Sequence, residues 1–230
     1  MKKITITISI LLISFYTYAQ DAASLLQSVR QKIDKVNDYE ATGKMKTNVA
    51  FLKVPIANVK VYFKKPNRLK VKSEKGISFI PKGAVNLNMS GVISDNKYTV
   101  LDAGTEKIGN TPVRVIKLLP LDDNSDIVLS TLYIDELSNL IQKAKTTTKE
   151  NGTYELQFTY GKYAAFSLPD KIIFSFNTRD YKLPKGVTFD FDDGTQQKKS
   201  TADVKNKKGR AEITFNSYTI NQGVSDAVFN

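Results

Sequence analysis

Residues 139–158 read N-L-I-Q-K-A-K-T-T-T-K-E-N-G-T-Y-E-L-Q-F and carry the strongest local structural signal in the chain. The Asn151-Gly152 dipeptide is typical of a two-residue β-hairpin turn, because both residue types tolerate the positive φ angles of such a turn. After the turn, alternate residues from Tyr154 to Tyr160 are apolar or aromatic and share one strand face. The stretch predicts an antiparallel hairpin, with strands near 141–149 and 154–160.

The same period-two pattern continues on both sides of the hairpin. Val59, Val61 and Phe63 alternate with polar residues, and a strand near 69–72 follows. Further strands are expected near 39–49, 97–103, 113–119, 127–135, 172–177, 187–192 and 211–218. No linker or repeat divides the chain, so one antiparallel domain is the simplest organisation.

Only one long amphipathic helix is expected, over residues 21–37. Its apolar positions recur at spacings of three and four residues, and Asp21 and Ser24 offer alternative N-cap oxygens. A short helical turn is expected near 82–89. The apolar stripe of the long helix comprises Leu25, Leu26, Val29, Ile33 and Val36.

Two predicted strands are apolar on both faces, at 113–119 and 172–176. A sheet is apolar on both sides when one side meets helices and the other meets a second layer or an enclosed ligand. A two-layer sandwich core remains an alternative on this pattern.

The N-terminus indicates export. Lys2 and Lys3 precede an uncharged run over 4–18 that ends in small residues at Ala19, as in a secretory signal peptide. We expect residues 1–19 to be removed, with cleavage after Ala19 or Gln20, and the remaining protein to be soluble in the periplasm. An uncleaved anchor is the alternative.

The composition excludes most common enzyme chemistry. The 230 residues include no Cys, His or Trp. Disulfides, thiol nucleophiles, Ser-His-Asp triads and ordinary zinc sites are therefore ruled out. No Walker A motif or strand–G-x-G-x-x-G–helix arrangement is present, so nucleotide binding has no support. We expect no enzyme activity, cofactor or metal.

The chain is basic, with 34 Lys+Arg against 23 Asp+Glu and a net charge of +11. Residues 62–72 interleave aromatic and cationic side chains, as single-strand nucleic-acid platforms do, but the export signal argues against nucleic acid. The excess charge indicates either a solvated basic face or attraction to an anionic membrane surface or acidic partner.

Two acidic clusters stand out, at 122–126 and 190–193. Paired carboxylates serve glycoside hydrolysis and oxygen-rich loops hold calcium, but neither cluster has a specific ligand spacing. Asp, Asn, Ser and Gly are also the residues of tight turns. We interpret Asp122, Asp123, Asp126, Asp190, Asp192 and Asp193 as turn residues.

Several short motifs occur in the order found in a known family. They are D-A-A-S at 21–24, K-K-P-N-R-L at 64–69, P-K-G-V-T-F-D at 184–190 and the hairpin above. Together they resemble the LolA-type periplasmic lipoprotein carriers over residues 21–194. The segment I-S-F-I-P-K-G at 77–83 resembles the Bacteroidota-type branch of that family.

The resemblance implies a mainly β (α+β) fold. This is an incomplete antiparallel β-barrel, or half-barrel, with an N-terminal helix and a short helical lid over a hydrophobic cavity. It further implies a monomeric carrier that takes lipoprotein acyl chains from an inner-membrane donor to an outer-membrane acceptor. A lipid- or lipoprotein-sensing module on the same fold, which regulates an envelope partner, is the alternative function.

The resemblance also implies functional residues. Lys65 occupies the position of a family arginine that latches the lid, although lysine lacks the planar fork of arginine. If Lys65 points into the cavity, alternation places Val59, Val61 and Phe63 beside it, and Phe63→Asp is expected to abolish acyl binding with the fold intact. Further lining is expected from Phe79, Ile80, Tyr98, Val115 and Phe158, and lid contacts from Val85, Leu87 and Met89. Core packing is the alternative role for the lining residues.

Residues 20–230 are thus expected to form a single LolA-like domain. Residues 195–230 are interpreted as a C-terminal strand extension, because the carriers mostly end sooner. Such an extension would cover a sheet edge, dock a partner or form a solvated hairpin.

Overall fold

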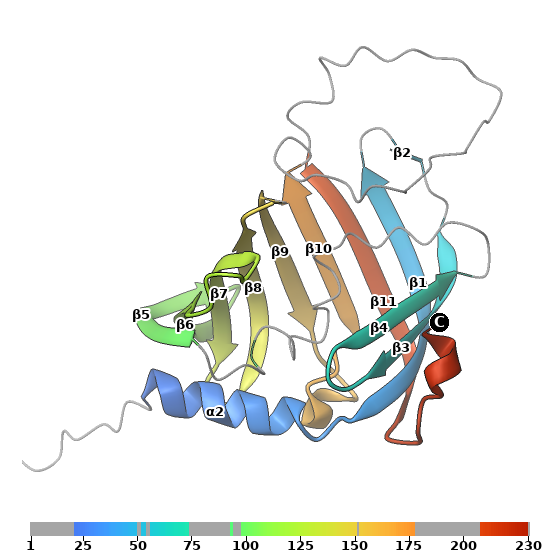
Figure 1. Cartoon of the computed structure of the whole chain (residues 1–230), viewed down its shortest axis with the longest axis horizontal. Coiled ribbons are helices and arrows are strands. Elements are labelled where there is room, and N and C mark those ends of the chain that lie inside the picture. Colours follow the sequence, from blue (N-terminus) through green and yellow to red (C-terminus); the bar gives the residue numbers. More distant parts are fainter. Residues whose placement is uncertain are drawn as a thin grey trace, which may run out of the picture.

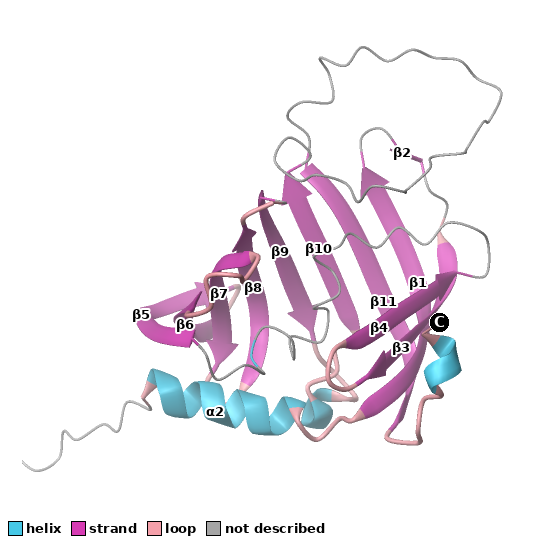
Figure 2. Cartoon of the chain, in the orientation of Figure 1, coloured by secondary structure: helices cyan, strands magenta, loops and turns pink. Residues whose placement is uncertain are grey.

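The computed structural model describes residues 21–49, 52–53, 56–73, 93, 98–150, 152–177 and 208–229. In this part of the chain one α-helix accompanies a large antiparallel sheet (Figures 1 and 2). The helix is α2 (Ala22–Ile33), and two 3-10 turns are η2 (Ala164–Phe166) and η3 (Asp226–Val228). The strands are β1 (Asp38–Val49), β2 (Leu52–Lys53), β3 (Ala57–Lys64), β4 (Arg68–Ser73), β5 (Tyr98–Ile108), β6 (Thr111–Pro120), β7 (Ile127–Asp135), β8 (Leu140–Thr148), β9 (Gly152–Thr159), β10 (Lys171–Asn177) and β11 (Lys208–Ile220).

The sheet is an open half-barrel. Its 11 strands run in the order β4-β3-β1-β11-β10-β9-β8-β7-β6-β5, with β2 paired to β1. Among the described strands β4 and β5 are the two ends and do not pair, so the barrel is incomplete. The sheet curves, and α2 lies across the lower end of its concave side (Figure 1). This confirms the predicted half-barrel with an N-terminal helix; the predicted lid falls outside the described residues.

The hairpin that the sequence predicts most strongly is present as β8–β9. Thr148 lies opposite Gly152, so residues 149–151 separate the two strands and the connection is longer than the two-residue turn expected at Asn151-Gly152. Gly152 has a φ of 71°, a left-handed backbone that glycine adopts without strain. Tyr154, Leu156 and Phe158 are buried, as the alternation predicts. The predicted hairpin is therefore present, but its register differs from the one that a two-residue Asn151-Gly152 turn would set.

The C-terminal strand β11 lies in the interior of the sheet, between β1 and β10. The expected extension at an edge or in solution was wrong for residues 208–220, because this strand joins the two halves of the half-barrel. Gly43 permits the close approach of β1: a Cβ there would lie 2.5 Å from the carbonyl oxygen of Thr214. Alternation predicts a strand but not its neighbours.

The core fills the concave side of the sheet, where the apolar stripe of α2 packs. Leu25 and Val29 are fully buried there. The helix is shorter than predicted and ends at Ile33, because the following backbone bonds elsewhere: Asn221 Nδ2 donates to Lys35 O at 2.8 Å and Asn37 N donates to Asn221 Oδ1 at 2.7 Å. In the described residues, no helix has the length and apolarity needed to cross a membrane.

Candidate functional site

A pocket of about 430 Å³ lies between α2 and β5. Because β5 is the last strand of the sheet on this side, the pocket opens at the edge of the half-barrel. Its volume is within the range of small-molecule sites, about 300–1,000 Å³. The described lining residues are Ala23, Leu26, Gln27, Arg30, Gln31, Tyr98 and Val100.

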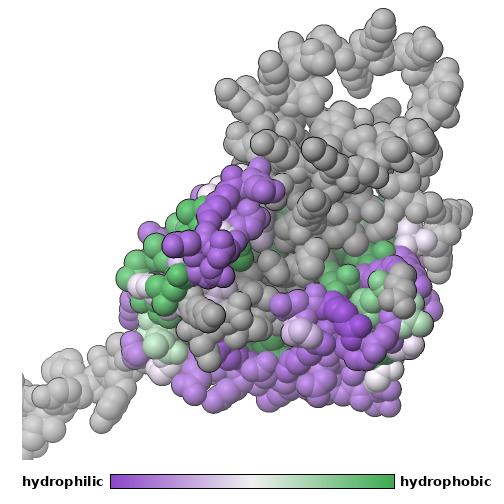
Figure 3. Space-filling view, viewed as in Figure 1, coloured by the Kyte–Doolittle hydropathy of each residue, from purple (hydrophilic) through white to green (hydrophobic). Residues whose placement is uncertain are grey.

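The pocket is apolar at its base and polar at its rim. Leu26 is buried, and Tyr98 and Val100 pack half-buried against the core. Gln27 and Gln31 are exposed, and Arg30 donates through Nη2 to the backbone oxygen of Ile93. Figure 3 shows hydrophobic side chains over β5 and β6, above the hydrophilic outer face of α2. Such a site suits a ligand with an apolar chain and a carbonyl-bearing or anionic head.

The apolar base of the pocket continues across the concave face. Val100 lies opposite Leu118, and the core extends from there to β7 and β9. The buried residues Leu132 and Phe158 belong to the same cluster. The pocket therefore borders the packed apolar core of the concave side.

The other end of α2 is closed. Around Ile33 the remaining cavity measures about 10 Å³, roughly the volume that one water molecule needs. The rings of Tyr39 and Phe63 lie 5.4 Å apart, and burial raises the pKa of the Tyr39 phenol. This end is lined by Ile33, Val36, Tyr39, Phe63, Phe166, Ser167 and Leu168.

Lys65 lies outside this closed end. Its Nζ donates to the backbone oxygen of Asp34 at 2.9 Å and pairs with Asp34 Oδ1 at 3.1 Å. A cation at the C-terminus of a helix is stabilising, because the unpaired carbonyls carry partial negative charge. Strand β3 ends at Lys64, so the alternation of that strand does not extend to Lys65, and the condition that Lys65 points into the cavity is not met by these contacts. Its contact with a helix carbonyl holds α2.

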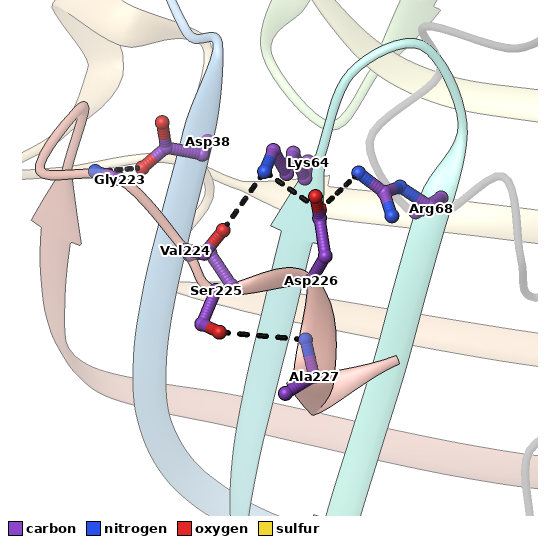
Figure 4. A network of polar contacts seen from close by, with 8 residues as sticks. All are labelled: Asp38, Lys64, Arg68, Gly223, Val224, Ser225, Asp226 and Ala227. Atoms are coloured by element: carbon purple, nitrogen blue, oxygen red, sulfur yellow. Dashed lines mark hydrogen bonds and ion pairs between the residues drawn. The ribbon is translucent and has the colours of Figure 1, made fainter. Parts of the chain in front are cut away.

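The C-terminal segment clamps the β3–β4 turn from the outer side (Figure 4). Asp226 Oδ1 accepts from Lys64 Nζ at 2.7 Å and from Arg68 Nη2 at 2.5 Å. Arg68 also lies over the ring of Phe229, 5.0 Å from its centroid. Gly223 N donates to Asp38 Oδ1 at 2.9 Å. These contacts hold the pKa of Asp226 below its ordinary value, with the Lys64 hydrogen bond the largest cause and that from Arg68 the next.

The structure places only part of the predicted lining together. Val59, Val61, Phe63 and Phe158 are buried in the concave core, where they pack against neighbouring side chains. Among the predicted lining residues that the structure describes, only Tyr98 borders the large pocket. Outside the described residues lie Phe79, Ile80, Val85, Leu87 and Met89.

Val115 requires a correction. It lies opposite Tyr133 on β7, on the face of β6 away from Ile116 and Leu118, which belong to the core. Because β6 is apolar on both faces, its alternation does not show which set faces the concave side. Val115 therefore does not line the concave side of the sheet.

Sequence reasoning missed the pocket side of α2 and its partner Val100. The helical pattern assigned Leu26 to the core but gave no reason to select Gln27, Arg30 and Gln31 on the adjoining polar side. Val100 fell within a predicted strand of mixed pattern. Only the packing of α2 against β5 brings these residues together.

The first acidic cluster forms turns, in agreement with its interpretation. Asn124 N donates to Asp122 Oδ1 at 2.9 Å, and Glu150 N donates to Asp126 Oδ1 at 3.3 Å. No group of three or more acidic side chains placed to hold a metal occurs in the part of the chain that the structure describes. The cluster at 190–193 lies outside that part.

Several solved structures have a similar fold. An outer membrane lipoprotein-sorting protein domain from Vibrio parahaemolyticus has a TM-score of 0.58 at 14% identity, covering 91% of this chain and 96% of its own. A DUF1329 family protein from Desulfovibrio piger has a TM-score of 0.58 at 13% identity, covering 91% and 97%. A LolA superfamily protein from Nitrosomonas europaea has a TM-score of 0.55 at 11% identity, covering 89% and 97%.

No protein-family model and no curated protein matches the sequence. The likeness to the solved structures therefore concerns the fold. This chain has the open half-barrel fold of the LolA superfamily, and its pocket lies at one edge of that fold.

Proposed function

We propose that this chain, on its LolA-type half-barrel, is a periplasmic carrier that binds lipoprotein acyl chains and escorts them towards the outer membrane. The observation that carries the proposal is the open pocket between α2 and β5, which borders the apolar concave core. Two solved structures with a similar fold, a lipoprotein-sorting protein domain and a LolA superfamily protein, support it.

Burial of the acyl chain supplies the driving force. Each CH₂ group removed from water contributes about 0.8 kcal/mol, so even part of a long chain binds appreciably. The pocket opens at the sheet edge, so an acyl chain leaves it without opening the sheet. A carrier needs both appreciable affinity and an open exit, because it must hold its cargo and then release it to an acceptor.

The polar rim suits the linkage of a lipoprotein. The acyl chains are joined through ester and amide carbonyls, which accept hydrogen bonds. Gln27 and Gln31 are exposed at the rim and carry amide donors. Binding of this kind makes no covalent bond, and the protein acts as a monomeric carrier between an inner-membrane donor and an outer-membrane acceptor.

Filling the pocket tests the proposal. Ala23 is exposed at the pocket wall, so Ala23→Trp adds a ring to the pocket without disturbing the core. We expect at least a tenfold loss of affinity for a triacylated cysteine peptide, measured by displacement of a fluorescent acyl probe from delipidated protein.

The matched control is Ser24→Trp, which places the same ring at an exposed position that the pocket lining does not include. This variant should bind the probe as the parent protein does. Equal binding by both tryptophan variants, on protein shown to be folded, would exclude this pocket as the acyl site.

A further inference from the structure

We propose that the outer edge of β5 binds the peptide that follows the acylated cysteine of a client, as an added antiparallel or parallel strand. The inference rests on the proposed function and names how the protein part of the cargo is held. Binding through the main chain would serve clients of unrelated sequence, because every peptide offers the same N–H and C=O groups.

The edge of β5 is accessible. In the described part of the chain β5 pairs only with β6. Thr99 and every residue from Leu101 to Lys107 are exposed. An edge strand directs alternate N–H and C=O groups away from its sheet, and these groups pair readily with another extended chain.

The same strand forms the wall of the proposed acyl site. Tyr98 and Val100 line the pocket, while Thr99 and Leu101 point to the opposite face of β5. A chain paired with β5 would run about 4.8 Å from it. An acyl chain in the pocket therefore brings the attached cysteine, and the peptide after it, beside this edge.

A β-bulge limits the part of the edge that can pair. The register of β5 shifts between Asp102 and Thr105, and Gly104 has a φ of 85°. Gly104 N donates to Asp102 Oδ1 at 2.9 Å, and Arg114 pairs with the other oxygen of Asp102. Bulges of this kind disrupt regular pairing. The regular segment Thr99–Asp102 adjoins the pocket, which fits a short linker peptide.

Exposed apolar side chains accompany this segment. Leu101 is 47% exposed and Leu119, opposite Thr99 on β6, is 37% exposed. Both lie on the face away from the pocket. Alternate side chains of a strand added beside β5 would contact Leu101, whereas Leu119 lies one strand further away on β6. Contact with Leu101 favours an extended peptide over a bare lipid.

The experiment compares the affinities of three ligands. One is a diacylglyceryl-cysteine amide, and the other two carry six further residues after the cysteine, in two unrelated Ser/Thr-rich sequences. We expect both extensions to tighten binding about fivefold or more over the amide. Hydrogen exchange of the β5 amides at 99–102 should slow with the extended ligands and not with the amide.

N-methylation of single peptide positions gives the decisive signature. In a paired strand only alternate residues direct their N–H groups to β5. N-methylation should therefore remove the extra affinity of the extended ligand at alternate peptide positions and leave it unchanged at the positions between them. Equal affinity of amide and extended ligands, or an equal effect at every position, would overturn the inference while leaving acyl binding intact. Failure of the amide itself to bind would instead overturn the proposed function. Protection of residues 99–102 in a ligand-free dimer would also overturn the inference, because a second copy would then occupy the edge.

Discussion

The two ends of α2 differ sharply in how they meet the half-barrel. At its C-terminal end the side chains around Phe63 leave a cavity of about 10 Å³, and at its β5 side a pocket of about 430 Å³ remains open. Polar contacts fasten the closed end: Lys65 donates to the backbone oxygen of Asp34, and Asn221 donates to that of Lys35. The Asp226 clamp holds the adjoining β3–β4 turn. One end thus anchors the helix and the other is free to bind.

This difference explains why the two ends tolerate change differently. A substitution at the closed end removes contacts of the folded state, whereas one at the pocket changes a surface that is already open. Effects on stability should therefore concentrate around Phe63 and Asn221, and effects on ligand binding around Ala23 and β5.

The largest effect on stability is expected from Phe63→Ala. Phe63 is 2% exposed and packs against Tyr39, so truncation should lower the free energy of unfolding by about 3–5 kcal/mol. Phe166→Ala at the same cavity should cost only about 1 kcal/mol, because Phe166 is 37% exposed. Urea denaturation measures both, and equal losses would contradict the closed packing of this end.

This packing also corrects an expectation from the sequence. Phe63→Asp would place a carboxylate in the core, where an unpaired charge is strongly unfavourable. The variant is expected to unfold, so it does not test acyl binding. Ala23→Trp takes its place as the test of the site.

A smaller effect is expected from Asn221→Ala. The Asn221 side chain bonds to the backbone at Lys35 and Asn37, and its φ of 56° is left-handed. Loss of these hydrogen bonds and of a residue type that tolerates this φ should lower the free energy of unfolding by about 1–3 kcal/mol.

Asn221→Gly provides the matched control, because glycine keeps the left-handed backbone and loses only the hydrogen bonds. It should be less destabilised than the alanine variant in the same denaturation experiment. A lower free energy of unfolding for the glycine variant than for the alanine variant would show that the left-handed backbone at position 221 does not limit stability.

The smallest effect is expected from the Asp226 clamp, which is largely exposed. Because the folded state lowers the pKa of Asp226 from 3.8, the clamp contributes fully at neutral pH and is lost as pH falls through the lowered value. Amide exchange at residues 223–229 should be constant from pH 5 to 8, after correction for intrinsic rates, and should accelerate in stronger acid. Asp226→Asn should show fast exchange throughout; unchanged exchange in this variant would mean that other contacts hold the tail.

Local signals in the sequence predicted much of the fold. The β8–β9 hairpin, the alternation of its strands and the apolar stripe of α2 depend on neighbours within a few residues. The interior position of β11, the end of α2 at Ile33 and the outward position of Val115 depend on pairings between distant segments. Period-two alternation carries no information on which strand lies beside which.

The candidate site was less predictable for the same reason. Tyr98, one of the predicted lining residues, borders the large pocket, but the residues opposite it on α2 were not predicted. The pocket arises from the fit between a helix and an edge strand far along the chain. Its polar rim resembles any solvated helix face in the sequence.

The central claim is that acyl chains bind between α2 and β5. A cysteine lipopeptide with a photoreactive diazirine in one acyl chain, cross-linked to delipidated protein and mapped by mass spectrometry, tests it most directly. The account predicts saturable labelling at Leu26, Tyr98 or Val100, which excess unlabelled lipopeptide suppresses and Ala23→Trp abolishes. Labelling confined to the outer face of the sheet, around Val115 and Tyr133, or labelling that does not saturate, would contradict it.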